Sequence, residues 1–379
     1  MDIKKILKEM IARGASDLHL KVATPPCFRI NGTLVFADYE PPTTQDMAAV
    51  TQQILAPSQR ESFEATKEID FAFGVPGVAR FRANFYLQRG SVAMVFRHVP
   101  VDIQAPDELG LPPVVKELAL RPRGLILVTG TVGSGKSTSL ASIVDIINRE
   151  SARHVITIED PIEFLHRDRK SIISQRELGC DTGDYAQALK HVLRQDPDVI
   201  LIGEIRDSES MKIALTAADT GHLVLSTMHT TDATQTISRI VSFFPPHQQQ
   251  EIRYLVASTI QAVISQRLVA DADGLRRYPA CEIMITTSTI REYIREAEKT
   301  VMIQQAIQEG FVQYQMQTFD QSLMQLYKEQ KITLEAATRA SSNPHEFELR
   351  IKGIQGSSDT TWDRFEESTK DNEQQLQKI

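Results

Sequence analysis

The sequence predicts an α/β protein in which a small α+β domain is joined by a linker to a parallel α/β domain with a helical appendage at its carboxyl end. Three observations predict this class. Residues 1–98 alternate apolar and polar side chains in short runs, as antiparallel strands do. Residues 99–116 contain four prolines and one glycine, which is typical of a linker. Residues 117–352 alternate β-branched apolar runs with helical segments, as a parallel sheet with crossover helices does.

The composition excludes several classes of protein. The 379 residues are 41% hydrophobic and 24% charged, which suits a folded chain with two or three cores. The net charge of -7 argues against nucleic acid as the main partner. The three cysteines form no CxxC pair, so neither a disulfide framework nor a zinc site is indicated. The chain has no apolar run long enough to span a membrane, and charges interrupt its apolar start, so we expect a cytoplasmic protein.

The elements of the first domain follow from local patterns. Apolar residues recur every three or four positions over residues 3–11, and Gly14 stands where such a helix would end. Alternation then predicts a strand at 18–22 and a hairpin at 27–36 that turns at Asn31-Gly32. Further strands are predicted at 69–74, 78–88 and 91–97. Together these elements form an antiparallel sheet with helices.

The second domain begins after the linker. Strands are predicted at 124–129, 155–158, 199–205 and 223–227, with a helix at 137–148. From residue 246 the pattern is mainly helical, at 248–268, 290–298, 301–308, 319–329 and 334–340. From Gly353 onward the chain is polar, with six acids and three bases, which predicts a disordered tail over 353–379.

A phosphate-binding motif follows the first strand of the second domain. Residues 130–137 read GTVGSGKS, which fits G-x-x-x-x-G-K-[ST] between a predicted strand and a predicted helix. In such loops the backbone N–H groups surround phosphate, the lysine reaches the β and γ oxygens, and the following hydroxyl binds Mg²⁺. The residues expected to bind a nucleotide here are Gly130, Gly133, Ser134, Gly135, Lys136, Ser137 and Thr138.

Carboxylates follow two neighbouring strands. Glu159, Asp160 and Glu163 come at the end of the strand at 155–158, and Glu204 ends the strand that begins at Val199. In parallel α/β sheets, ligands bind at the carboxyl ends of the strands. Phosphoryl transfer needs a bound Mg²⁺, a water oriented toward the γ-phosphate and positive charge near the phosphate oxygens. Glu163 and Glu204 are the candidates for holding Mg²⁺ and for orienting the water. Spacing leaves open which acid does which.

These motifs together resemble those of the type II/IV secretion and type IV pilus ATPases. Residues 193–207, LRQDPDVILIGEIRD, resemble that family's signature, residues 157–163 its acidic box, and 220–231 its histidine box, with His222 and His229. Within the family, residues 288–296 and 316–320 resemble segments of the retraction ATPases, the PilT/PilU branch. One departure is Thr131-Val132, where that branch often has Pro-Thr. A nucleotide needs only backbone contacts at these two positions, so the departure leaves the expectation of nucleotide binding unchanged.

The resemblance implies a PAS-like amino-terminal domain and a RecA-like P-loop ATPase domain. It implies a homohexamer that hydrolyses ATP with Mg²⁺ and powers retraction of a type IV pilus, hence twitching motility. Catalytic roles would fall to Glu204, Glu163, Lys136 and His229, with Ser137, Glu163 and Glu204 near the metal. Arg82 and Arg97, with Arg80, would act as arginine fingers on a neighbouring subunit's phosphates.

The resemblance also implies partners and alternatives. The ring would act peripherally at the inner membrane, on a platform protein at the pilus base, and a second retraction ATPase is a further expected partner. The PilU-type accessory retraction ATPases are the nearest alternative. A nucleic-acid translocase of the same superfamily is disfavoured by the acidic charge. A ring subunit that only binds ATP is disfavoured because Lys136, Ser137, Glu163 and Glu204 are all present. The direction of work, the ring symmetry and the platform-binding residues are left open.

Overall fold

A computed structural model describes residues 1–274 and 276–351. The chain divides into two compact units. The amino-terminal unit comprises Met1–Asp102 and the short segment Pro161–Leu165, and the P-loop unit comprises the described residues of Ile103–Asp160 and those after Leu165. The predicted tail at 353–379 lies outside the described residues.

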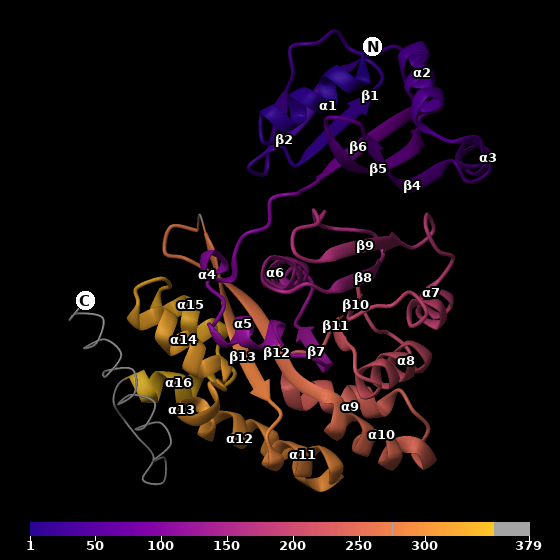
Figure 1. The fold of residues 1–379 in the computed structure, drawn as a ribbon. Helices are drawn as coiled ribbons and strands as arrows, with labels where there is room; N and C mark the ends of the chain where they lie inside the picture. The colour runs from indigo at the N-terminus through magenta and orange to yellow at the C-terminus, as the bar shows by residue number, and fades with distance from the viewer. Residues whose placement is uncertain (275, 352–379) are drawn as a thin grey trace. The chain divides into compact units, whose positions relative to one another are not determined.

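The amino-terminal unit contains one six-stranded antiparallel sheet with three helices (Figure 1). The strand order is β3-β2-β1-β6-β5-β4. The strands are β1 (Asp17–Lys21), β2 (Thr24–Ile30), β3 (Thr33–Phe36), β4 (Glu68–Val75), β5 (Ala79–Gln88) and β6 (Ser91–Val99). The helices are α1 (Ile3–Ala12), α2 (Thr44–Ile54) and α3 (Pro57–Thr66). The antiparallel sheet and the hairpin at Asn31-Gly32 are as predicted, and both turn residues have positive φ.

Alternation along β5 separates two faces of this sheet. Phe81, Ala83 and Phe85 are buried, whereas Arg80, Arg82 and Asn84 are only half-buried. Phe85 packs edge-on against three other rings, at centroid distances of 5.2 Å to Phe71, 5.7 Å to Phe96 and 6.5 Å to Phe63. Burial of these large rings contributes to this unit's hydrophobic stabilisation, together with aliphatic side chains of the same core. The other face therefore carries the arginines.

The P-loop unit is built on a seven-stranded sheet of order β13-β12-β7-β11-β10-β8-β9. Strands β12, β7, β11, β10, β8 and β9 are parallel to one another, and β13 is antiparallel at one edge. The strands are β7 (Gly124–Thr129), β8 (His154–Glu159), β9 (Ile172–Glu177), β10 (Val199–Ile202), β11 (Leu223–Met228), β12 (Ile260–Ala270) and β13 (Arg277–Ile285). The mixed α/β class is confirmed.

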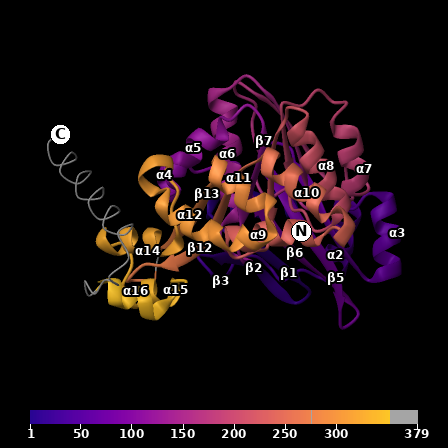
Figure 2. The same ribbon diagram turned by 90° about the horizontal axis from the view of Figure 1, so that it is seen from below.

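Helices cover both faces of this sheet (Figures 1 and 2). The first helices are α4 (Pro106–Leu109), α5 (Val114–Ala119), α6 (Lys136–Glu150), α7 (Tyr185–Val192), α8 (Ser208–Asp219), α9 (Ala233–Ser242) and α10 (Pro246–Thr259). The later ones are α11 (Ser288–Arg295), the 3₁₀ helix η1 (Ala297–Met302), α12 (Ile303–Glu309), α13 (Phe311–Tyr314), α14 (Phe319–Lys328), α15 (Leu334–Ala340) and α16 (Pro344–Ile351). No helix of the described chain is both long and apolar enough to cross a membrane.

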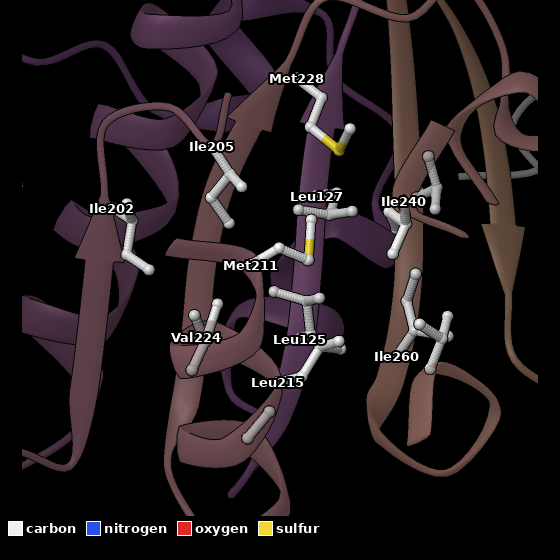
Figure 3. Packing of buried hydrophobic residues seen from close by; sticks show 14 of the residues in the cluster. Leu125, Leu127, Ile202, Ile205, Met211, Leu215, Val224, Met228, Ile240 and Ile260 are labelled. Carbon is white, nitrogen blue, oxygen red and sulfur yellow. The ribbon is translucent and has the colours of Figure 1, made fainter. Parts of the chain in front are cut away.

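The core lies on both sides of β7. Leu125 and Leu127 belong to one cluster, which includes Met211, Leu215 and Ile240 from the helices on that face (Figure 3). The intervening Ile126 and Val128 belong to a second cluster on the opposite face, with side chains of α5 and α6. All six residues of β7 are buried, because a strand with helices on both faces contacts apolar neighbours in both directions.

The prediction of one helix over residues 248–268 is wrong. Helix α10 ends at Thr259, and residues 260–270 form β12, which lies between β7 and β13. Because both faces of β12 are covered, its apolar residues run on without the alternation that marks a half-buried strand. The partner strand β13 was not predicted at all. Tertiary pairing therefore decided the structure of this segment.

Candidate functional site

The glycine-rich loop connects β7 to α6 at the carboxyl edge of the sheet. Gly130, Gly133 and Gly135 have φ angles of 143°, 78° and 90°, which side-chain-bearing residues rarely adopt. A Cβ atom on Gly130 would lie 2.5 Å from the Gln266 carbonyl oxygen and 2.5 Å from Ser134 Oγ. Glycine is therefore required at Gly130 by both conformation and space.

Lys136 is held at this loop. It is 8% exposed, and its Nζ donates to the carbonyl oxygens of Gly130 and Thr131, each at 2.9 Å. Lys136 begins α6, whose N-cap position, Gly135, offers no side chain to cap the helix. The backbone N–H groups of Lys136, Ser137 and Thr138 therefore face the loop together with the positive end of the helix dipole. Such an arrangement binds phosphate.

A cavity of about 260 Å³ adjoins the loop. Two buried polar atoms in its lining residues, Ser134 Oγ and Gln266 Oε1, have no hydrogen-bond partner among the described residues. Unpaired buried polar atoms are costly, so their presence indicates room for a ligand that satisfies them. The cavity is lined by Leu109, Leu111, Ser134, Gly135, Thr138, Ser139, Gln266, Leu268, Arg277 and Pro279. Its mixed apolar and polar wall next to a phosphate loop fits a nucleotide.

Glu204 follows β10 at the same edge and lies between a histidine and an arginine. His229 Nε2 is 3.1 Å from Glu204 Oε2, and Arg206 Nη2 donates to Glu204 Oε1. Burial alone would raise the pKa of Glu204, but the hydrogen bonds and charges of Arg206 and His229 hold the pKa below its ordinary value. Glu204 is therefore an oriented carboxylate at neutral pH.

Two parallel strands bring this acid and this histidine together. Glu204 comes two residues after β10, and His229 directly follows β11, its neighbour in the sheet. The Thr227 hydroxyl donates to the Gly203 carbonyl oxygen at 2.7 Å, and this bond links the two strand ends. The signature acid and the histidine that follows β11, which the sequence did not link, are thus in direct contact.

Tyr185 is a member of this edge that sequence reasoning missed. A Cβ on Gly203 would lie 2.9 Å from Tyr185 Oη, so Gly203 leaves room for the phenol. Burial, and then the charges of Asp160, Glu204 and Glu159, raise the pKa of Tyr185. The phenol is thus neutral, because burial and three acids disfavour its ionised form. No spacing rule marks it, because it reaches the edge from the start of α7.

The acids after β8 are divided between the two units. Glu159 ends β8 in the P-loop unit, where it accepts hydrogen bonds from Thr157 Oγ1 at 2.7 Å and Gln175 Nε2 at 3.1 Å. Glu163 lies in the segment Pro161–Leu165 of the amino-terminal unit, 3.8 Å from Arg82 Nη2. Arg82 and Glu163, which lie 81 positions apart in the sequence, are thus neighbours in the amino-terminal unit.

The other predicted residues have local partners. Arg97 Nε forms an ion pair with Asp17 at 2.8 Å while most of its side chain stays exposed. His222 stands before β11, at the opposite end of that strand from His229, and its Nδ1 is 3.0 Å from the Ala217 carbonyl oxygen at the end of α8. His222 therefore lies away from the glutamate that His229 contacts.

The described residues contain no group of three or more His, Cys, Asp or Glu side chains able to hold a metal ion. A magnesium ion bound mainly by phosphate oxygens and water needs only one or two protein oxygens. Ser137, the second residue of α6, and Glu204, two residues after β10, both lie at the carboxyl edge of the sheet.

The chain belongs to the type II/IV secretion system protein family, whose model matches residues 1–362. The fold and the site therefore define a P-loop ATPase of the secretion and pilus class.

More specific relatives are ATPases of type IV pili. The type IV pilus retraction ATPase PilT of Pseudomonas aeruginosa is 43% identical over 347 residues, which cover 92% of this chain and 100% of that protein. The type IV pilus ATPase PilU of the same organism is 37% identical over 355 residues, 93% of this chain and 92% of that protein. A crystal structure of the pilus retraction motor PilT with bound ADP superposes with a TM-score of 0.84 at 46% identity, covering 92% of this chain and 99% of that one.

Proposed function

We propose that this protein is an ATP-hydrolysing motor that powers retraction of a type IV pilus. The observation that carries the proposal is the joint arrangement of a phosphate loop with a held lysine and an ionised glutamate fixed by a histidine. The similarity to PilT over nearly the whole of both chains supports the retraction activity.

The roles of the residues follow from their places. The loop N–H groups and Lys136 bind the phosphates of ATP. Ser137 and Glu204 would hold Mg²⁺, which neutralises phosphate charge when bound. Glu204 orients the attacking water or acts through the metal shell, and Glu163 is the candidate for the other task. His229 fixes the orientation of Glu204. A change at the phosphates that moves Glu204 would therefore also move His229 and the segment that leads into α9.

The remaining features of the proposal concern assembly. We infer a homohexamer in which nucleotide binding and release drive domain movements, and these movements perform the mechanical work. The ring would be cytoplasmic and peripheral at the inner membrane, on a platform protein at the pilus base. Arg97, which is largely exposed, is the candidate for contact with a neighbouring subunit's phosphates.

Steady-state ATPase assays together with mass measurement of the oligomer test the motor. Lys136→Ala and Glu204→Gln should each lower turnover by about 10²–10³-fold. The first removes the positive charge that would bind the phosphate oxygens, and the second removes the carboxylate that would orient the water or hold the metal. Glu204→Gln should retain nucleotide, since the loop is intact. Glu209→Gln, an exposed acid paired with Lys190, is the matched control and should hydrolyse ATP normally. A monomer without turnover would refute the motor.

Pilus retraction in cells then tests the direction of work. Cells that carry Lys136→Ala should assemble pili and fail to twitch. The similarity to PilU favours an accessory retraction ATPase as the second candidate. In that case the protein restores twitching only when another active retraction ATPase is present.

A further inference from the structure

The segment Pro161–Leu165 belongs to the amino-terminal unit, although the chain on both sides of it belongs to the P-loop unit. The backbone therefore passes between the two units at 102–103, at 160–161 and at 165–166. The segment carries Glu163, one of the two candidate catalytic acids. Its attachment decides which unit Glu163 follows when the units move.

Contacts within the amino-terminal unit hold the tip of this segment. Arg82 Nη2 donates to the Pro161 carbonyl oxygen at 3.1 Å, and Arg82 Nε donates to the Ile162 carbonyl oxygen at 3.3 Å. The Leu165 N–H donates to the Pro100 carbonyl oxygen at 3.0 Å. Two backbone carbonyls and one backbone N–H of the segment are therefore bonded within the amino-terminal unit.

Contacts within the P-loop unit hold the chain on either side of the 161–165 segment, which we call its base. Gln175, on β9, donates from Nε2 to Glu159 Oε1 at 3.1 Å. Its Oε1 accepts from the His166 N–H at 2.9 Å. One amide side chain thus binds the residues on both sides of the segment, Glu159 before it and His166 after it. Because Gln175 lies on a strand of the sheet, the base moves with the P-loop unit.

We propose that Arg82 is a positioning residue that acts within its own subunit, holding the 161–165 segment so that Glu163 moves with the amino-terminal unit. Glu159 stays with the P-loop unit, held by Gln175. Relative movement of the units thus changes the distance of Glu163 from the phosphate loop, which makes hydrolysis depend on domain position. This inference rests on the proposed function, because it assigns a use to a catalytic acid.

The same contacts argue against the role first expected of Arg82, an arginine finger on a neighbouring subunit. Its Nε and Nη2 atoms both donate within the amino-terminal unit, and its side chain is 25% exposed. Arg97, opposite it on β6, is 63% exposed. Releasing Arg82 would leave two carbonyl oxygens without their charged donor, and such bonds are the stronger kind.

Hydrogen exchange measured by mass spectrometry on the full chain tests the attachment itself. Arg82→Ala should speed exchange of the Leu165 amide by about tenfold, because the tip loses two hydrogen bonds from a charged group. Arg82→Lys should give a smaller increase, since one ammonium group cannot reproduce the two-point contact. Arg97→Ala is the matched control and should leave exchange in 161–165 unchanged. Gln175→Ala should instead speed exchange of the His166 amide.

Mixed rings distinguish action within one subunit from action on a neighbour. Arg82→Ala and Lys136→Ala subunits, each with a different tag, are expressed together, and rings that contain both are purified with the two tags. A finger acting on a neighbour predicts recovered ATPase activity, because Lys136→Ala subunits lend an intact Arg82 to the intact sites beside them. The intrasubunit role predicts no recovery. In Arg82→Ala alone, kcat should fall while ADP binding stays unchanged.

The outcomes separate this inference from the proposed function. Faster exchange at Leu165 with no recovery in mixed rings supports the inference. Unchanged exchange in Arg82→Ala, or recovered activity in mixed rings, overturns it. If wild-type rings hydrolyse no ATP, the proposed function fails; the exchange experiment still shows if Arg82 holds the segment.

Discussion

Glu282 is a carboxyl group buried in the P-loop unit, and its replacement by glutamine tests how burial controls stability. The residue lies on β13 and is 1% exposed. Its Oε1 accepts from the Ala233 N–H at 2.8 Å, at the start of α9, and its Oε2 accepts from Gln304 Nε2 at 3.0 Å, on α12. The charged groups that act on it are Asp232 and Arg267.

Burial raises the pKa of Glu282 from its ordinary 4.5 to about 7, and the two hydrogen bonds only partly oppose this. The folded protein therefore binds a proton that the unfolded chain releases between pH 4.5 and 7. In that window the free energy of unfolding falls as pH rises, and above pH 7 the loss is complete. At 1.36 kcal/mol for each pH unit, the loss is about 3 kcal/mol.

Urea unfolding of wild type and Glu282→Gln at pH 5, 6, 7 and 8, followed by circular dichroism, measures this effect. Relative to the variant, wild type should lose about 2–3 kcal/mol between pH 5 and 8. Glu335→Gln, which replaces a largely exposed acid on α15, is the control and should behave as wild type. Parallel curves for wild type and Glu282→Gln would refute the reasoning, because they would mean that Glu282 titrates near its ordinary pKa.

Three further predictions follow from other parts of the molecule. Gly130→Ala should weaken ADP binding by about tenfold or more in a fluorescence titration, because of its strained φ and the contact of the new Cβ with Gln266; an unchanged Kd would contradict this. Among the three cysteines only exposed Cys180 should react with iodoacetamide under native conditions, since Cys281 is buried and burial raises its pKa to about 12. Mass spectrometry of the peptides checks this, and labelled Cys281 would show that its surroundings open. Phe85→Ala should destabilise the amino-terminal unit by about 3–5 kcal/mol, because it leaves a cavity among three rings. Urea unfolding measures this, and a loss below about 1 kcal/mol would show that the site collapses around the smaller side chain.

The site could be predicted wherever its residues are consecutive. The glycines, Lys136 and Ser137 form one short motif, so their spacing alone indicates a phosphate loop. Tyr185 and Gln266 belong to no such motif, because each reaches the site from another element. Their contribution arises from the packing of α7 and β12 against the strands that carry the motif.

The fold shows the same division. Local periodicity determined α1, the hairpin at Asn31-Gly32 and the buried strand β7, since each has a pattern that holds within its own few residues. It could not determine β12, whose apolar run suits a helix or a strand equally; pairing with β7 and β13 decided between them. Likewise the sequence by itself placed Glu163 among the acids after β8. Only the tertiary structure decided that its segment is held by Arg82, because hydrogen bonds between residues eighty positions apart follow from the fold and leave no local pattern.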